Sequence, residues 1–148
     1  MFTKVFNNKY LLLTFRLLLG FVFIYAAIFK VVDAQGFSQS IYNYKLMPDL
    51  TINALSIVIP WIELVAGLLL ILGISVKENS LILSSLLLIF IIAISISLAR
   101  GLNIECGCFG TVSGAKVGLL KIFENVGLFI VGLILIKFDS KFLSLSKQ

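Results

Sequence analysis

The sequence has no histidine, and among 148 residues it has only two cysteines, two prolines and one tryptophan. Without histidine the chain lacks the commonest metal ligand and the commonest general base, which argues against zinc hydrolases and haem proteins with histidine ligands. Charged residues are also scarce, at 13%, whereas a soluble domain carries about a quarter. Hydrophobic residues make up 60% and the mean hydropathy is +1.13. Such a chain cannot cover itself with a polar surface, so much of it must face lipid.

The net charge of +5 comes from lysines and arginines scattered between the hydrophobic runs. No basic block of the kind that binds nucleic acid is present. We therefore expect the lipid bilayer as a partner and no nucleic acid. The length allows a single domain over residues 1–148, and four membrane spans would use most of it.

Four hydrophobic runs predict an all-α fold, a four-helix transmembrane bundle. The predicted spans are residues 10–29, 54–74, 81–99 and 117–136. The first run resembles a secretory signal peptide, but it is longer than a signal core and contains Arg16, which favours a retained helix.

The segments between the spans also carry predictions. Polar residues and tyrosines alternate over residues 30–53, which indicates an ordered loop or a short helix at the membrane interface. A turn is predicted at residues 77–79, between the second and third spans. Lysine and arginine are slightly enriched on the side of the termini, which places the termini in the cytoplasm and the loop after the third span outside it.

The two cysteines stand together as Cys106-Gly107-Cys108 in that outer loop. A disulfide across so small a loop is strained and more oxidising, and it restricts the unfolded chain little. Thiol–disulfide exchange therefore suits the pair better than a structural role. Two alternatives stay open: two inert buried thiols, or a soft ion such as Cu(I). A zinc site would need a dimer, or carboxylates such as Glu105, to reach four ligands.

Four charged residues lie within the predicted spans, where an unpaired charge is costly and charges are usually paired or functional. They are Arg16, Glu63, Lys121 and Glu124. Lys121 and Glu124 are three residues apart and so share a helix face. The long side chain of Arg16 could reach toward Glu63.

These charges have a functional interpretation and a simpler one. In the first, Arg100 and Lys121 lower the pKa of a cysteine thiol, because nearby cations favour the thiolate, and Glu63 or Glu105 relays protons. In the second, the charges neutralise one another in pairs or extend to the membrane surface.

Three segments resemble a known group of membrane proteins. Residues 16–30 are similar to the opening helix of DoxX-type proteins, and residues 60–67 are similar to their second helix. Residues 100–102, followed by Cys-Gly-Cys-Phe-Gly at 106–110, resemble the methylamine-utilisation MauE branch of that superfamily. The likeness runs in the same order over nearly the whole chain. One departure is Glu124-Asn125, where the family often has Arg-Asn or Arg-Asp.

The resemblance implies a four-helix protein of the bacterial inner (cytoplasmic) membrane. It also implies a thioredoxin-like periplasmic partner and a link to the maturation of methylamine dehydrogenase. Cys106 and Cys108 would be the redox pair, exchanging electrons with that partner and with a membrane carrier such as a quinone. The alternatives are a non-catalytic membrane subunit or assembly factor, and a conduit for small solutes or ions lined by Glu63, Glu124 and Arg16.

Overall fold

The structure is a computed structural model that describes residues 4–5, 8–102 and 118–138. Over these residues it contains helices and no strands. The five helices are α2 (Lys9–Val32), α3 (Ala34–Asn43), α4 (Asp49–Leu72), α5 (Val76–Ala99) and α6 (Leu119–Lys137). All except α3 are long and apolar enough to cross a membrane. The predicted four-helix transmembrane fold is confirmed, and α3 is the short helix predicted between the first two spans.

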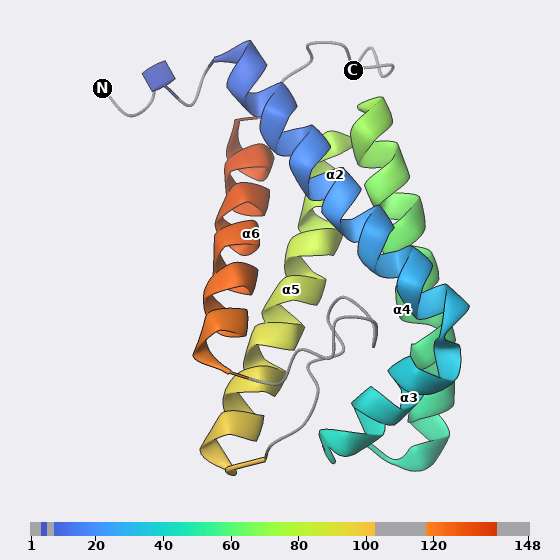
Figure 1. Cartoon of the computed structure of the whole chain (residues 1–148). Coiled ribbons are helices and arrows are strands. Elements are labelled where there is room, and N and C mark those ends of the chain that lie inside the picture. Colours follow the sequence, from blue (N-terminus) through green and yellow to red (C-terminus); the bar gives the residue numbers. More distant parts are fainter. Residues whose placement is uncertain (1–3, 6–7, 103–117, 139–148) are drawn as a thin grey trace.

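The four long helices run alongside one another, with α3 lying across one end of the bundle (Figure 1). The end of α5 and the start of α6 lie at this same end, which we call the α3 end. The start of α2, the turn between α4 and α5 and the end of α6 lie at the opposite end. This is the up-and-down order expected of four successive spans. The assignment of the α3 end to the extracytoplasmic side stays a prediction.

Small residues let the helices approach closely in two pairs, α2 with α4 and α5 with α6. A Cβ added to Gly67 of α4 would lie 3.1 Å from the carbonyl oxygen of Gly20 on α2. A Cβ added to Gly132 of α6 would collide with the hydroxyl of Ser84 on α5. Close backbone contact of this kind is how helices associate in lipid, where no hydrophobic effect drives them together.

A single residue joins α2 to α3. The backbone N–H of Asp33 donates to the carbonyl of Phe29 and ends α2. The Asp33 side chain then accepts from the N–H of Gly36 at 3.0 Å and caps the start of α3. Because one residue serves both helices, the chain turns from α2 into α3 without a loop.

The structure corrects the predicted turn at residues 77–79, which lie in the first turn of α5. The chain turns at residues 73–75 instead. Gly73 ends α4 in the left-handed conformation, with a φ of 74°. The side-chain amide of Asn79 reaches back to donate to the carbonyls of Ile74 and Ser75 at 2.8 and 3.1 Å. Asn79 therefore stabilises the turn from inside the helix that follows.

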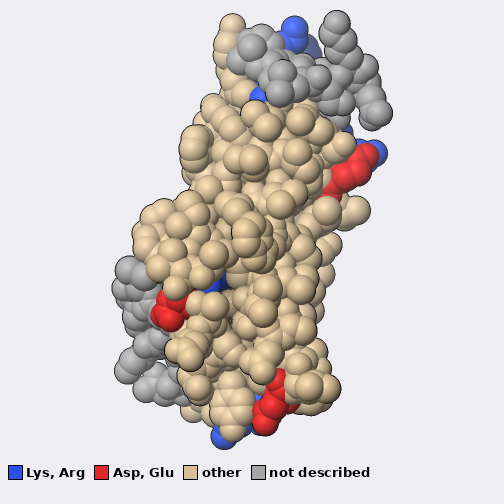
Figure 2. Space-filling view, turned by 90° about the vertical axis from the view of Figure 1, so that its right-hand side faces the viewer, with Lys and Arg blue, Asp and Glu red and all other residues tan. Residues whose placement is uncertain are grey.

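Most of each span faces outward. Buried residues make up only 17% to 39% of the most apolar window of each long helix. The core consists of aliphatic side chains such as Leu19, Leu70, Leu83 and Leu135, all at most 1% exposed. On the face shown in Figure 2, uncharged side chains cover most of the surface. An outward surface of this kind requires hydrocarbon around it.

Candidate functional site

A buried ion pair connects α2 to α4 near the α3 end. The ammonium of Lys30, in the last turn of α2, donates to both carboxylate oxygens of Glu63 at 2.9 and 3.0 Å. Each side chain is only 1% exposed. Two charges so fully removed from water are tolerated because each satisfies the other.

Aromatic rings complete the surroundings of Lys30. Its Nζ lies 5.0 Å from the ring centre of Phe37 on α3 and 4.9 Å from that of Phe90 on α5. A cation over an aromatic face is attracted by the ring quadrupole. Lys30 thus contacts α3, α4 and α5, and the contacts hold these helices around the end of α2.

The pairing of Lys30 with Glu63 was not predicted from the sequence. The predicted first span ended at residue 29, just before Lys30, and Arg16 was the group expected to reach toward Glu63. The structure continues α2 to Val32, three residues beyond the predicted span, so Lys30 becomes part of the buried helix. Arg16 is also buried on α2, at 2% exposed. A signal for the pair was present, since Lys30 and Glu63 are opposite charges on successive spans.

The predicted proximity of Lys121 and Glu124 on α6 is confirmed. The ammonium of Lys121 donates to a Glu124 oxygen at 2.9 Å, and the side chains are 17% and 42% exposed. Glu124 also lines a groove of about 520 Å³ with Tyr25 of α2 and other apolar residues. The pair neutralises both charges, so the positive charge of Lys121 has a partner within its own helix.

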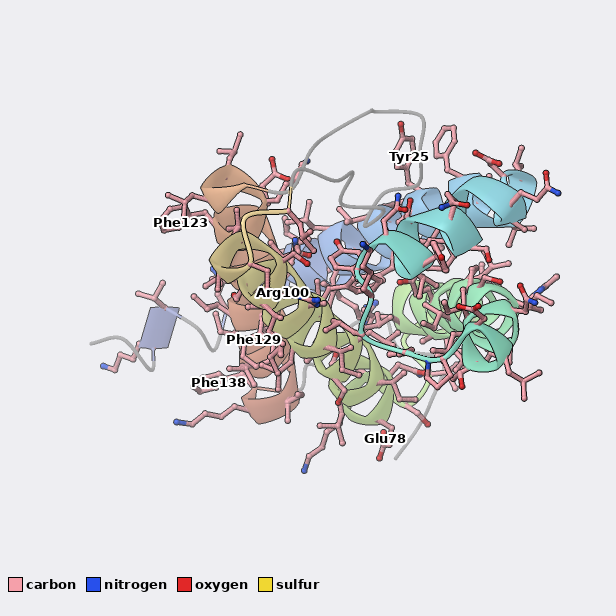
Figure 3. All side chains as sticks on the ribbon, turned by 90° about the horizontal axis from the view of Figure 1, so that it is seen from below. Tyr25, Glu78, Arg100, Phe123, Phe129 and Phe138 are labelled. Carbon is pink, nitrogen blue, oxygen red and sulfur yellow. The ribbon has the colours of Figure 1, made fainter. Side chains whose placement is uncertain are left out.

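At the α3 end, Arg100 binds the backbone next to α3. It follows α5, and its Nη1 donates to the carbonyl oxygen of Tyr44 at 3.4 Å. Figure 3 views the molecule from this end and shows Arg100 among the helix ends, whereas Phe123 points outward from α6. Burial raises the pKa of the Tyr44 hydroxyl to about 12. In the described part of the chain, no carboxylate forms an ion pair with Arg100.

Three predicted site residues lie outside the described residues: Cys106, Cys108 and Glu105. The helices that flank this segment in the sequence meet at one end of the bundle, since α5 ends and α6 begins at the α3 end (Figure 1). Over the described ranges, no three potential metal-ligating side chains come together.

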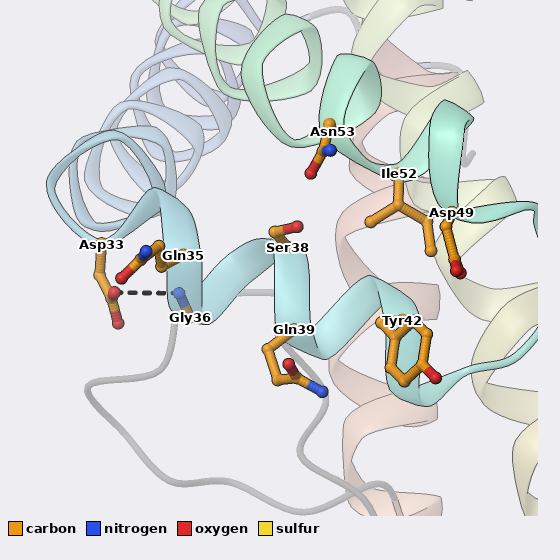
Figure 4. Close-up of a pocket in the computed structure, with 9 residues that line it drawn as sticks. All are labelled: Asp33, Gln35, Gly36, Ser38, Gln39, Tyr42, Asp49, Ile52 and Asn53. Atoms are coloured by element: carbon orange, nitrogen blue, oxygen red, sulfur yellow. Dashed lines mark hydrogen bonds between the residues drawn. The ribbon is translucent and has the colours of Figure 1, made fainter.

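A polar cavity of about 740 Å³ lies between α3 and the start of α4 (Figure 4). Carboxylates, amides and hydroxyls line it, including Asp33, Gln39, Tyr42 and Asp49. Sequence analysis did not single out these residues as a site. Their common signal was the polar composition of the segment that joins the first two spans.

Comparison with known proteins relates the chain to one family. Residues 8–138 match the family described as methylamine utilisation protein MauE. A methylamine utilization protein MauE of Methylorubrum extorquens is 34% identical over 104 residues, which are 70% of this chain and 56% of the relative. The protein of the same name from Paracoccus denitrificans is 28% identical over 112 residues, 75% of this chain and 60% of the relative.

The chain thus spans less than two thirds of the length of these curated relatives. No solved structure matches it. The family match covers all four long helices, and it agrees with the MauE resemblance of the Cys-Gly-Cys segment. This chain is a multi-pass membrane protein that belongs to the MauE family.

Proposed function

We propose that this protein is an accessory membrane protein of methylamine utilisation that exchanges thiols and disulfides through Cys106 and Cys108. The observation that carries the proposal is the position of the cysteine pair between α5 and α6. The end of α5 and the start of α6 both lie at the α3 end of the bundle (Figure 1), and Arg100 at that end has no carboxylate partner among the described residues. A cation that is not neutralised favours a nearby thiolate.

The exchange needs only the cysteine pair and a second dithiol–disulfide protein, which we propose is thioredoxin-like and extracytoplasmic. A thiolate of one protein attacks a disulfide sulfur of the other, breaks that S–S bond and forms a mixed disulfide. The second thiolate of the attacking protein then attacks that protein's own sulfur in the mixed disulfide, and the sulfur of the other protein leaves as a thiolate. One disulfide is lost and one is gained, and two electrons and two protons pass between the proteins.

The two alternative functions gain less from the structure. A conduit lined by Glu63 would need its carboxylate to face a passage, but both its oxygens bind Lys30 and its side chain is 1% exposed. A purely structural membrane subunit does not require the cysteines. Thiol chemistry is therefore the property that distinguishes the proposals.

The test is to trap the mixed disulfide in intact cells. Cys106→Ala and Cys108→Ala each leave one thiol, and the variant that keeps the attacking cysteine should accumulate a covalent complex that is cleaved by reductant. After acid quenching and thiol alkylation, the complex is identified on non-reducing gels and by mass spectrometry. A protein with a thioredoxin-like active site in the complex supports the proposal.

The control is the double variant Cys106→Ser/Cys108→Ser, which must form no complex. If neither single variant forms a reductant-sensitive complex, and the double variant supports methylamine growth as well as the wild type does, the exchange proposal is wrong and the structural subunit takes its place.

A further inference from the structure

An apolar cavity of about 270 Å³ lies between α3, α4 and α5, and its lining includes Phe37 and Phe90, the two rings that contact Lys30. Apart from Ser40 and Tyr44, every residue that lines it is apolar. The Ser40 hydroxyl donates to the carbonyl of Gly36 at 3.0 Å, so its proton is already used. A polar group placed here would lose its hydrogen bonds to water without replacement. The cavity therefore suits hydrocarbon.

The cavity opens toward the bilayer. Among its lining residues, Val58 of α4 is 49% exposed and Ile89 of α5 is 56% exposed, and both helices are membrane spans. Their exposed surface faces lipid, because it lies within the hydrophobic length of the bundle. A chain from a membrane lipid can thus enter between α4 and α5 without crossing water.

Two positively charged residues lie next to Tyr44, which lines the cavity. Arg100 donates to the Tyr44 carbonyl, and Lys45, the next residue, is exposed. Lys45 has a φ of 52°, in the left-handed region, at the turn that follows α3. Two cations beside an apolar cavity match the two parts of an anionic lipid, a phosphate and an acyl chain.

We propose that this cavity binds an anionic phospholipid, with one acyl chain between α3, α4 and α5 and the phosphate beside Lys45 and Arg100. Lipid binding at this site requires neither the cysteine pair nor the proposed exchange, although both proposals involve Arg100. Because a cation near a membrane surface attracts an anionic lipid with about 1 kcal/mol, removal of one cation weakens binding about fivefold.

The test uses delipidated protein in detergent, titrated with dioleoyl phosphatidylglycerol or dioleoyl phosphatidylcholine and followed by native mass spectrometry. The two lipids share the same chains, so their difference measures the headgroup. We expect tighter binding of phosphatidylglycerol. Lys45→Asn should weaken it about fivefold and leave phosphatidylcholine unchanged, since asparagine tolerates the left-handed conformation. Lys77→Asn, at the opposite end of the bundle, should change neither lipid.

The acyl chain is tested by filling the cavity. Ala93→Phe should abolish binding of both lipids, and Ala93→Leu, a smaller change that the fold accepts more readily, should weaken both. Ala99→Phe, on the exposed part of the same helix, should leave both unchanged. Equal affinity for the two lipids in the wild type would overturn the proposal. So would an unchanged affinity in both Ala93 variants, or saturation of the cavity by an uncharged quinone that phosphatidylglycerol does not displace.

Discussion

The Lys30–Glu63 pair can be tested by removing one charge at a time. Glu63→Gln leaves the Lys30 ammonium among apolar and aromatic side chains, at 1% exposed and without a counter-charge. Truncating one partner of a buried pair costs about 3–5 kcal/mol. We expect the lower end of this range for Glu63→Gln, because the amide oxygen still accepts one hydrogen bond. Glu63→Leu accepts none and should reach the upper end.

The double variant separates the pair from the packing around it. Lys30→Met/Glu63→Leu replaces both charges by apolar side chains of similar size, a change that is often neutral or stabilising. We therefore expect its free energy of unfolding to lie within about 1 kcal/mol of the wild type, although Lys30→Met alone is strongly destabilising. The difference between the double variant and the sum of the single ones gives the coupling energy.

The exposed pair Lys121–Glu124 is the matched control, with the same 2.9 Å contact but side chains 17% and 42% exposed. Glu124→Gln should cost at most about 1 kcal/mol. The assay is reversible unfolding in mixed micelles by a denaturing detergent, followed by far-ultraviolet circular dichroism. If Glu63→Gln is no less stable than Glu124→Gln, or if the double variant is as unstable as the single ones, the pair does not hold α2 to α4 as argued.

Three further outcomes are expected. Arg100→Ala should raise the pKa of the reactive cysteine thiol, measured as the alkylation rate against pH, and Lys77→Ala should not; equal shifts would exclude a local effect of Arg100. Gly20→Ala should lower the free energy of unfolding by about 1–3 kcal/mol, because its Cβ would lie 3.0 Å from a backbone oxygen of α4. Gly127→Ala meets nothing and should be neutral or stabilising by up to about 1 kcal/mol, so equal losses would contradict close packing at Gly20. Burial raises the pKa of the Tyr44 hydroxyl from 10.0 to about 12, so its contribution to the free energy of unfolding should be fully present below pH 10 and lost between pH 10 and 12, by about 1.4 kcal/mol per pH unit. Tyr44→Phe should flatten the curve of unfolding free energy against pH in this range, and an unchanged slope would contradict the burial.

The membrane spans could be predicted from sequence because a helix that crosses the bilayer needs a long apolar segment, and the hydropathy of the sequence identifies such segments directly. The ends of the spans were less accurate. Hydropathy places a boundary where charges begin, but Lys77 and Glu78 lie within α5. The true boundary was set by Gly73 in its left-handed conformation and by Asn79, whose side chain donates to the preceding turn. These are local hydrogen-bonding features that an average over many residues does not detect.

The candidate site was predicted unevenly for a related reason. The Lys121–Glu124 pair follows from helical spacing alone and was predicted correctly. The Lys30–Glu63 pair joins residues 33 positions apart, and it depends on how far α2 continues and on where α2 packs along α4. Spacing along the chain predicts neither the length of α2 nor the position at which it packs on α4. A search for opposite charges on neighbouring spans would have proposed Lys30 as a partner, together with Arg16, only if it had included the residues that flank each predicted span.

The buried ion pair also constrains how the protein can be made. Glu63 lies past the midpoint of α4, and an isolated acidic or basic side chain near the centre of a spanning helix opposes insertion by about 2.5–3.5 kcal/mol. Released into lipid alone, α4 would expose a carboxylate to hydrocarbon, and α2 would carry an unmatched ammonium. Neither charge is exposed to hydrocarbon alone if α2 stays beside the insertion machinery until α4 has been synthesised. The α2–α3–α4 segment would then enter the bilayer as one unit, already neutral.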